Sequence, residues 1–100
     1  MIKIKILVKF CIDADIIDCP VDILNNLTEY RHKFIDWLYD KENNHSYWIY
    51  KNGKQCGCCY RSEAFVEWLN YFVLPNSVVK AKVLESNVVS WDKNLTNVFF

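Results

Sequence analysis

YWIYKNGKQCGCCY, residues 47–60, holds a tight-turn signal between two runs of strand-forming residues. Asn52 and Gly53 form this signal, because both central residues of a type I′ turn need a positive φ, which Asn tolerates and Gly adopts freely. A two-residue turn also fixes the register of the strands that it joins. The expected pairs are Lys51 with Lys54, Tyr50 with Gln55, Ile49 with Cys56, Trp48 with Gly57 and Tyr47 with Cys58. The sequence therefore predicts a β-hairpin in the middle of the chain.

This register sorts the side chains of the hairpin onto two faces. The more apolar face carries Tyr47, Ile49, Cys56, Cys58 and Tyr60. The opposite face carries Trp48, Tyr50, Gln55, Gly57 and Cys59. We expect the first face to meet the helices of the domain and the second to stay open.

The composition is typical of one small folded domain. The 100 residues are 52% hydrophobic and 16% aromatic, which excludes a disordered chain. Twelve basic and twelve acidic side chains cancel, so no overall field favours nucleic acid or a membrane surface. No apolar run approaches membrane-spanning length, and residues 1–9 alternate with lysine unlike a signal peptide. Together with an odd number of cysteines, five, these features predict reduced thiols and a cytoplasmic location.

The first half of the chain predicts a strand followed by a helix. Residues 2–12 alternate with period two, which is typical of a strand with one buried face. Residues 13–19 are expected to form an acidic connection, and Pro20 suits the first turn of a helix. Apolar side chains then recur at spacings of three and four, at Ile23, Leu27, Tyr30, Phe34 and Trp37. This pattern predicts an amphipathic helix over residues 20–39, which residues 41–44 follow as a loop.

The second half predicts a helix, a strand and an apolar tail. Ser62 is a favourable N-cap for a helix whose apolar face contains Phe65, Trp68, Leu69 and Phe72. Pro75 is expected to end this helix at or before Leu74. Residues 78–84 alternate as a strand, and residues 87–100 are too apolar for a solvated tail. The tail should therefore pack on the domain or on a partner.

The order strand, helix, strand, strand, helix, strand predicts an α+β domain of the ferredoxin-like type. Residues 1–86 would form this domain and residues 87–100 a C-terminal extension. Right-handed crossovers would place the first and third strands at the centre of an antiparallel sheet, with both helices on one face. We expect Ile6 and Val8 of the central strand to lie in the core beneath Phe34 and Phe65 of the two helices.

The sheet face without helices is the predicted partner-binding surface. Its residues are Lys3, Lys5, Lys9, Trp48, Tyr50, Lys80 and Lys82, with Trp91 from the tail. A simpler alternative is that the lysines only solvate this face and the tail folds over Trp48 and Tyr50. Because large exposed apolar patches are uncommon on monomers, we expect the tail to cover part of this face and leave an aromatic and basic patch.

No catalytic or metal-binding motif emerges, and we expect neither a cofactor nor a metal. Cys56, Cys58 and Cys59 lack a second pair of closely spaced ligands, and strand alternation would send Cys58 and Cys59 to opposite faces. Asp13, Asp15 and Asp18 could bind magnesium weakly, but a solvated loop whose acids favour the start of the following helix is the preferred explanation. His32 and His45 have no visible nucleophile or acid partner.

These features favour a non-enzymatic protein-interaction module, an inhibitor or adaptor. Tyr and Trp are enriched at binding hot spots, and the chain has six Tyr and four Trp. Phage or mobile-element antagonists of bacterial defence systems, and immunity proteins, often have this size and lack catalytic motifs. The first alternative is a nucleic-acid or nucleotide-binding sheet, in which lysines hold phosphates and Trp48 and Tyr50 stack on bases. The second is a small metal-dependent enzyme that uses Asp13 and Asp15. A monomer and a homodimer both remain compatible with the sequence.

Overall fold

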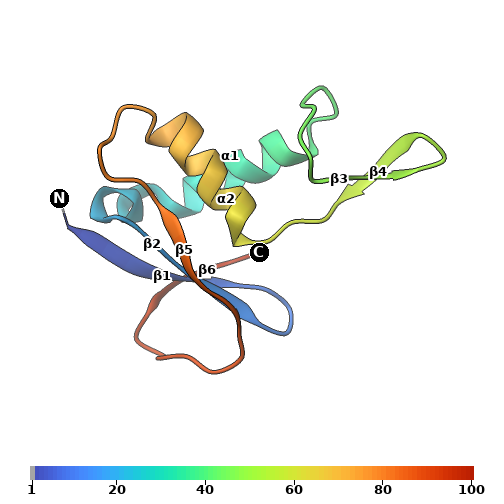
Figure 1. The fold of residues 1–100 in the computed structure, drawn as a ribbon. Helices are drawn as coiled ribbons and strands as arrows, with labels where there is room; N and C mark the ends of the chain where they lie inside the picture. Colours follow the sequence, from blue (N-terminus) through green and yellow to red (C-terminus); the bar gives the residue numbers. More distant parts are fainter. Residues whose placement is uncertain (1) are drawn as a thin grey trace.

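The computed structural model describes residues 2–100 and shows an α+β fold with two sheets and two main helices (Figure 1). The strands are β1 (Lys3–Lys9), β2 (Ala14–Pro20), β3 (Trp48–Lys51), β4 (Lys54–Cys58), β5 (Lys82–Val88) and β6 (Thr96–Phe99). The helical segments are the 3₁₀ helix η1 (Val21–Asn26), α1 (Leu27–Tyr39), α2 (Ser62–Trp68) and the π-helical turn η2 (Leu69–Val73). Within residues 2–100, no helix combines the length and apolar character needed to cross a membrane.

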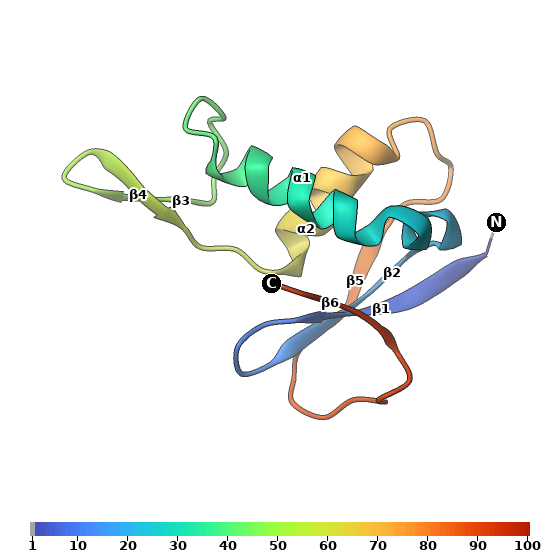
Figure 2. The same cartoon turned by 180° about the vertical axis from the view of Figure 1, so that it is seen from behind.

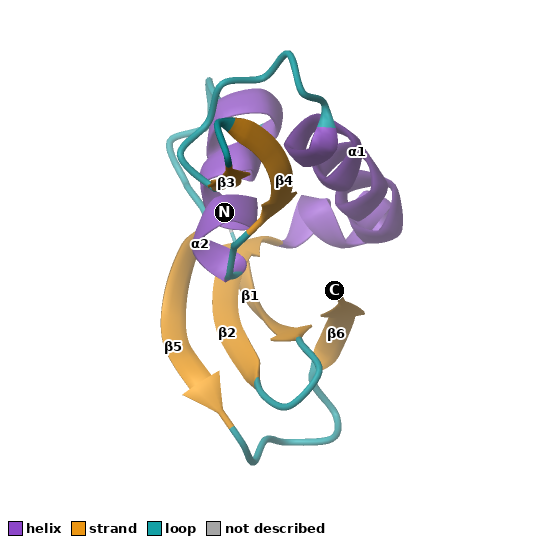
Figure 3. Cartoon of the chain, turned by 90° about the vertical axis from the view of Figure 1, so that its right-hand side faces the viewer, coloured by secondary structure: helices purple, strands orange, loops and turns teal. Residues whose placement is uncertain are grey.

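The strand order departs from the ferredoxin-like prediction. The main sheet is mixed, with the order β5-β2-β1-β6, and β3 and β4 form a separate two-stranded sheet. β1 and β2 are therefore the central strands, rather than β1 and a strand of the hairpin. The helices cover one side of the main sheet, as expected (Figure 3). The hairpin of β3 and β4 projects past the helices, away from the main sheet (Figures 1 and 2).

β1 has the predicted alternation but ends earlier than expected. Ile6 and Val8 are fully buried under the helices, and both belong to the main core cluster. The predicted strand over residues 2–12 is wrong beyond Lys9, because the chain reverses there and Phe10 N–H donates to the Asp13 carbonyl at 2.8 Å. Ile12 lies in this turn with 90% of its surface exposed.

The segment predicted as an acidic connection, residues 13–19, is instead almost entirely strand. β2 pairs with β1 in an antiparallel register and is buried along most of its length. Its acidic residues are compatible with a buried strand because cations approach them: Arg61 contacts Asp15, and Lys3 lies 2.8 Å from Asp18. Sequence polarity predicted a loop because these partners cannot be identified from local sequence.

The helices follow the predicted apolar faces with different ends. Pro20 is the last residue of β2, so the first helical segment starts with η1 and becomes α-helical at Leu27. The second helix begins with Ser62 itself rather than being capped by it. It widens into η2, where Leu74 N–H donates to the Leu69 carbonyl at 2.8 Å, just before Pro75.

The last predicted strand, residues 78–84, is displaced along the chain. Val78 is 99% exposed, and β5 starts only at Lys82. Asn70 fixes the chain just before β5, because its side-chain amide exchanges two hydrogen bonds, of 2.9 and 2.8 Å, with the backbone of Ala81. The alternating apolar pattern of residues 78–84 therefore begins in the loop before β5 and predicts the start of the strand too early.

The main core is aromatic and centres on Phe34. Phe34 is completely buried, and its ring packs against Phe65 of α2 at 5.4 Å and against Phe100 at 5.8 Å. Phe65 is also buried, so the predicted core contributions of both helices are confirmed. Phe100 completes the cluster from the segment that follows β6.

The opposite side of the main sheet has a smaller core. Leu7, Ala14 and Ile16 are buried there, against Trp91 and Leu95 among others. Trp91 and Leu95 of the tail therefore pack on this face of the main sheet, whereas Trp48 and Tyr50, which the tail was expected to cover, lie on the separate hairpin. The division at residue 86 stays a prediction, although β5 runs across that position and β6 pairs in parallel with β1.

Candidate protein-interaction groove

The projecting hairpin has the predicted turn and an unpredicted bulge. Asn52 and Gly53 have φ values of 54° and 77°, as a type I′ turn requires. The two pairs nearest the turn have the expected register, but an irregularity between Ile49 and Tyr50 then shifts it. The observed partners farther from the turn are Ile49 with Gly57 and Trp48 with Cys58. The two predicted faces of the hairpin are therefore wrong beyond the bulge.

His45 joins the base of the hairpin to α1. Its ring stacks on Trp48 at 5.1 Å and packs against Trp37 at 4.9 Å. Its Nε2 lies 2.7 Å from the Leu38 carbonyl, and its Nδ1 accepts the Tyr47 N–H. Trp48, predicted to lie on an open face, is consequently buried in this contact.

The predicted partner-binding residues do not form one surface. Trp48 and Tyr50 lie on the separate hairpin, where Tyr50 is 55% exposed. The Lys9 ammonium lies 5.8 Å from the indole ring of Trp91, and the register of the main sheet places Lys5 and Lys82 on either side of Asp18. The other predicted lysines are Lys3 and Lys5 on β1, Lys80 in the loop before β5, and Lys82 at the start of β5. Lys3 is paired with Asp18, and Lys80 donates to the carbonyls of Leu74 and Pro75.

Asp13 and Asp15 are brought together, but around a cation of the protein itself. The guanidinium of Arg61 donates to Asp13 at 2.8 Å and to Asp15 at 2.6 Å. Asp15 also accepts the hydroxyl and the backbone N–H of Ser62 and the backbone N–H of Asn87. Burial raises the pKa of Asp15, but these hydrogen bonds outweigh it and leave the pKa below its ordinary value. The carboxylates therefore serve a structural role in this geometry.

The five cysteines are free thiols, and three of them, Cys11, Cys58 and Cys59, line one hollow. Burial, with Asp18 nearby, raises the pKa of the Cys19 thiol to about 11. Cys58 donates to the Leu38 carbonyl, whereas Cys11, Cys56 and Cys59 are exposed. Within residues 2–100, no three His, Cys, Asp or Glu side chains are placed to bind one metal ion.

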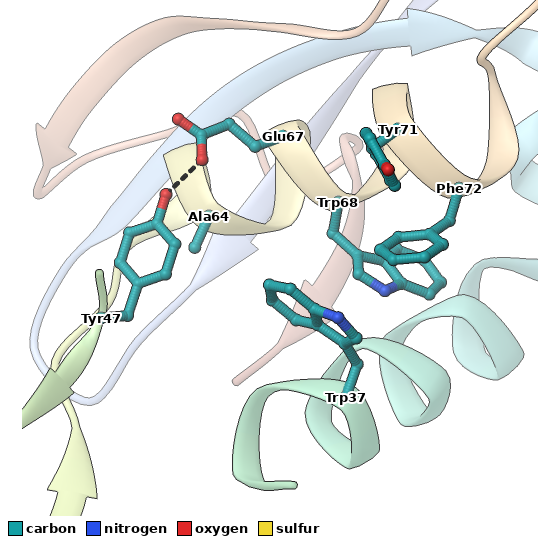
Figure 4. Close-up of a pocket in the computed structure, with 7 residues that line it drawn as sticks. All are labelled: Trp37, Tyr47, Ala64, Glu67, Trp68, Tyr71 and Phe72. Atoms are coloured by element: carbon teal, nitrogen blue, oxygen red, sulfur yellow. Dashed lines mark hydrogen bonds between the residues drawn. The ribbon is translucent and has the colours of Figure 1, made fainter. Parts of the chain in front are cut away.

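Several aromatic side chains line a groove between the two helices (Figure 4). Its first part is a hollow of about 390 Å³ lined by Trp37, Tyr47, Ala64, Glu67, Trp68, Tyr71 and Phe72. A second hollow is lined by Tyr30, Lys33, Trp37, Trp68, Phe72 and Val73. Because Trp37, Trp68 and Phe72 line both hollows, the two form one continuous surface, which we call the aromatic groove.

The helices position this groove by their packing. Trp37 reaches it from α1, and Phe72 faces it from η2, with ring centres 5.9 Å apart. Trp68, at the end of α2, lies 5.8 Å from Phe72 and forms the inner wall. π-helical turns such as η2 occur often at functional sites, because they redirect side chains from the regular helical path. Phe72 and Tyr71 are accordingly 50% and 74% exposed.

One end of the aromatic groove is acidic. The hydroxyl of Tyr47 donates to Glu67 Oε2 at 2.5 Å across the mouth of the hollow (Figure 4). Burial, together with the acceptor Glu67 and the charge of Glu63, raises the pKa of Tyr47. Lys33 lies at the other end, where it pairs with Glu29 at 3.3 Å.

The sequence interpretation missed this groove because it assigned Trp37, Trp68 and Phe72 to the core faces of their helices. A signal was present in the second helix. Aromatic residues at 68, 71 and 72, added to Phe65 and Leu69, make it apolar over more of its circumference than one sheet face can cover.

Comparison with known proteins gives no relative from which a role could be transferred. No family model, curated protein or solved structure matches this chain.

Proposed function

We propose that the protein is a non-enzymatic interaction module, an inhibitor or adaptor, that binds a protein partner through the aromatic groove. The observation that carries the proposal is the gathering of Trp37, Trp68, Tyr71 and Phe72 in one open hollow. Tyr and Trp contribute most to protein-binding hot spots, and buried aromatic anchors account for much of the affinity of an interface. Exposed aromatic rings gain free energy when a partner removes them from water.

The setting proposed for this activity is an antagonist of a bacterial defence system carried by a phage or mobile element, or an immunity protein, acting in the cytoplasm. Its support is the small size, the balanced charge and the aromatic groove. The nucleic-acid alternative is weakened because Lys3, Lys9 and Lys80 are each engaged within the protein. The metal-enzyme alternative is weakened because Arg61 is the cation between Asp13 and Asp15.

Affinity capture with groove variants tests the proposal. The tagged protein is used to capture binding proteins from the organism that encodes it, and these are identified by mass spectrometry. The informative variant is Tyr71→Ala with Phe72→Ala, because both side chains line the groove and are at least half exposed. We expect it to lose a partner that the unmodified protein retains.

Two matched controls make the result specific. Val78→Ser changes a side chain that is 99% exposed outside the groove and should retain the partner. Tyr50→Ser tests the hairpin residue predicted from the sequence. If Tyr50→Ser loses the partner and the groove variant retains it, the binding site lies on the hairpin, and the proposed role of the groove is wrong.

A further inference from the structure

We infer that the aromatic groove selects a partner segment that presents an apolar or aromatic side chain next to a Lys or Arg. The inference rests on the proposed function and adds to it the chemical class of the ligand. The apolar side chain would occupy the hollow between Trp37 and Phe72, and the cation would lie against Glu67.

The apolar part of the ligand follows from the groove lining. Six of the seven residues that line the first hollow are aromatic or Ala, and Glu67 is the remaining one. The ring of Phe72 packs against those of Trp37 and Trp68 at centre distances of 5.9 and 5.8 Å, and all three side chains line the hollow. A polar ligand side chain would displace water from this lining without forming favourable dispersion contacts with the rings.

The cation follows from the charge around Glu67. Glu63 and Glu67 are both exposed and lie four residues apart, on one face of α2. In the part of the chain that the structure describes, neither forms an ion pair, and the Lys that lines the groove is already paired with Glu29.

The hydrogen bond from Tyr47 fixes Glu67 for this role. It uses Oε2, so Oε1 of the same carboxylate can accept from a ligand ammonium or guanidinium. The cation would also meet the faces of electron-rich rings, which attract Lys and Arg. An acidic segment would instead face two carboxylates at the same position, and we expect it to bind more weakly.

Three indoles whose side chains carry a positive, no or a negative charge test the inference. Tryptamine is cationic, N-acetyltryptamine is neutral and indole-3-propionate is anionic at pH 7. Each is titrated into the complete protein, and the side-chain NMR signals of Trp37 and Trp68 report binding at the groove. We expect tryptamine to bind roughly threefold more tightly than the neutral indole, as one exposed ion pair would give. Indole-3-propionate should bind most weakly.

Two variants locate the source of this preference. Glu67→Gln keeps an oxygen acceptor for Tyr47 but removes the charge, and should make the three indoles bind alike. Glu85→Gln removes one charge from exposed β5 and should leave their order unchanged. Equal binding of all three indoles to the unmodified protein, or an unchanged order in Glu67→Gln, would overturn the cationic ligand while leaving the groove as a binding site. If none of the three shifts the groove signals, both the ligand class and the groove as a binding site are overturned.

Discussion

Asp15 accepts hydrogen bonds from residues of two separate parts of the chain. Arg61 and Ser62 lie at the start of α2, and Asn87 lies in β5 with a φ of 58°. Only 1% of Asp15 is exposed, so water cannot replace these partners. Because α2 has no cap from its own sequence neighbours, the carboxylate of β2 satisfies its first N–H group from outside.

Replacing Asp15 by Ala should therefore lower the free energy of unfolding by about 3 kcal/mol, since several hydrogen bonds to a buried charge are lost together. Chemical denaturation measures the loss. Asp13→Ala is the control: it removes a single contact to a partly exposed guanidinium and should cost less than about 1 kcal/mol. Equal losses for the two variants would show that Asp15 has no special role.

The stabilisation from Asp15 should depend on pH in acid only. Its pKa in the folded protein lies below the ordinary value of 3.8, so the full contribution is present above that value, where both states are ionised. As the pH falls through the lower pKa of the folded state, the carboxylate is protonated and the contribution disappears. Unfolding of the unmodified protein and of Asp15→Asn, followed from neutral pH to about pH 3, should give a constant difference that then shrinks. A difference that grows on acidification would reverse the sign and contradict this assignment.

At the scale of elements, the hairpin of β3 and β4 depends on its turn more than on packing. Among residues 2–100 no further strand pairs with it, and an isolated hairpin is only marginally stable. Its anchors are concentrated at its base, where Trp48 Nε1–H donates to the Asn43 carbonyl and the indole stacks on His45.

Gly53→Val should open this hairpin, at a cost of about 1–2 kcal/mol, because a β-branched residue does not hold a positive φ. The loss should appear as faster amide hydrogen exchange in β3 and β4, with less effect on the main sheet. Gly57→Val is the matched control: φ there is not positive, and an added Cβ would have no heavy atom within 4 Å. If both variants exchange alike, the turn does not determine the stability of the hairpin.

At the scale of the whole molecule, β6 and Phe100 close the core. Phe100 N–H donates to the Lys9 carbonyl at 2.8 Å, and its ring packs on Phe34 and Phe65. The adjacent Phe99 points the other way and is 55% exposed. Because the two neighbouring side chains are identical, a difference between their Ala variants in stability reports the difference in burial.

Phe100→Ala should destabilise the protein by about 3 kcal/mol, the lower range for removing a large core aromatic, because the ring is only partly buried. Phe99→Ala should cost less than about 1 kcal/mol. Thermal and chemical unfolding of the two variants give the comparison. A larger loss for Phe99→Ala would mean that the tail packs in the opposite orientation.

The sequence predicted features that depend on local patterns. The alternation around Ile6 and Val8 gave the buried face of β1, and Asn52 with Gly53 gave the turn. It failed where a distant partner decides the structure. Asp15 belongs to a strand because Arg61 and Ser62, 46 and 47 residues away, neutralise and bind it.

The aromatic groove was beyond prediction for a related reason. Helical spacing marks Trp37 and Phe72 as apolar positions, but only the angle between the helices decides which apolar residues reach the sheet. The structure places Phe34 inside and leaves Phe72 half exposed. Composition suggested a surplus of aromatic residues without locating it.

The parallel pairing of β6 with β1 has a consequence for the order in which the protein folds. Ile6 is paired with Thr96, so this ladder joins the first and the last strand along the described part of the chain. The β1–β2 hairpin can form as soon as it is synthesised. The other edge of β1 stays unpaired until β6 has been synthesised, after nearly all the intervening residues. Contacts so distant in sequence form slowly, because a long loop must close before they are made. During that delay the edge of β1 is open to strands of other molecules. Newly made protein should thus be most prone to aggregation before β6 arrives, and a chaperone would help most in that interval.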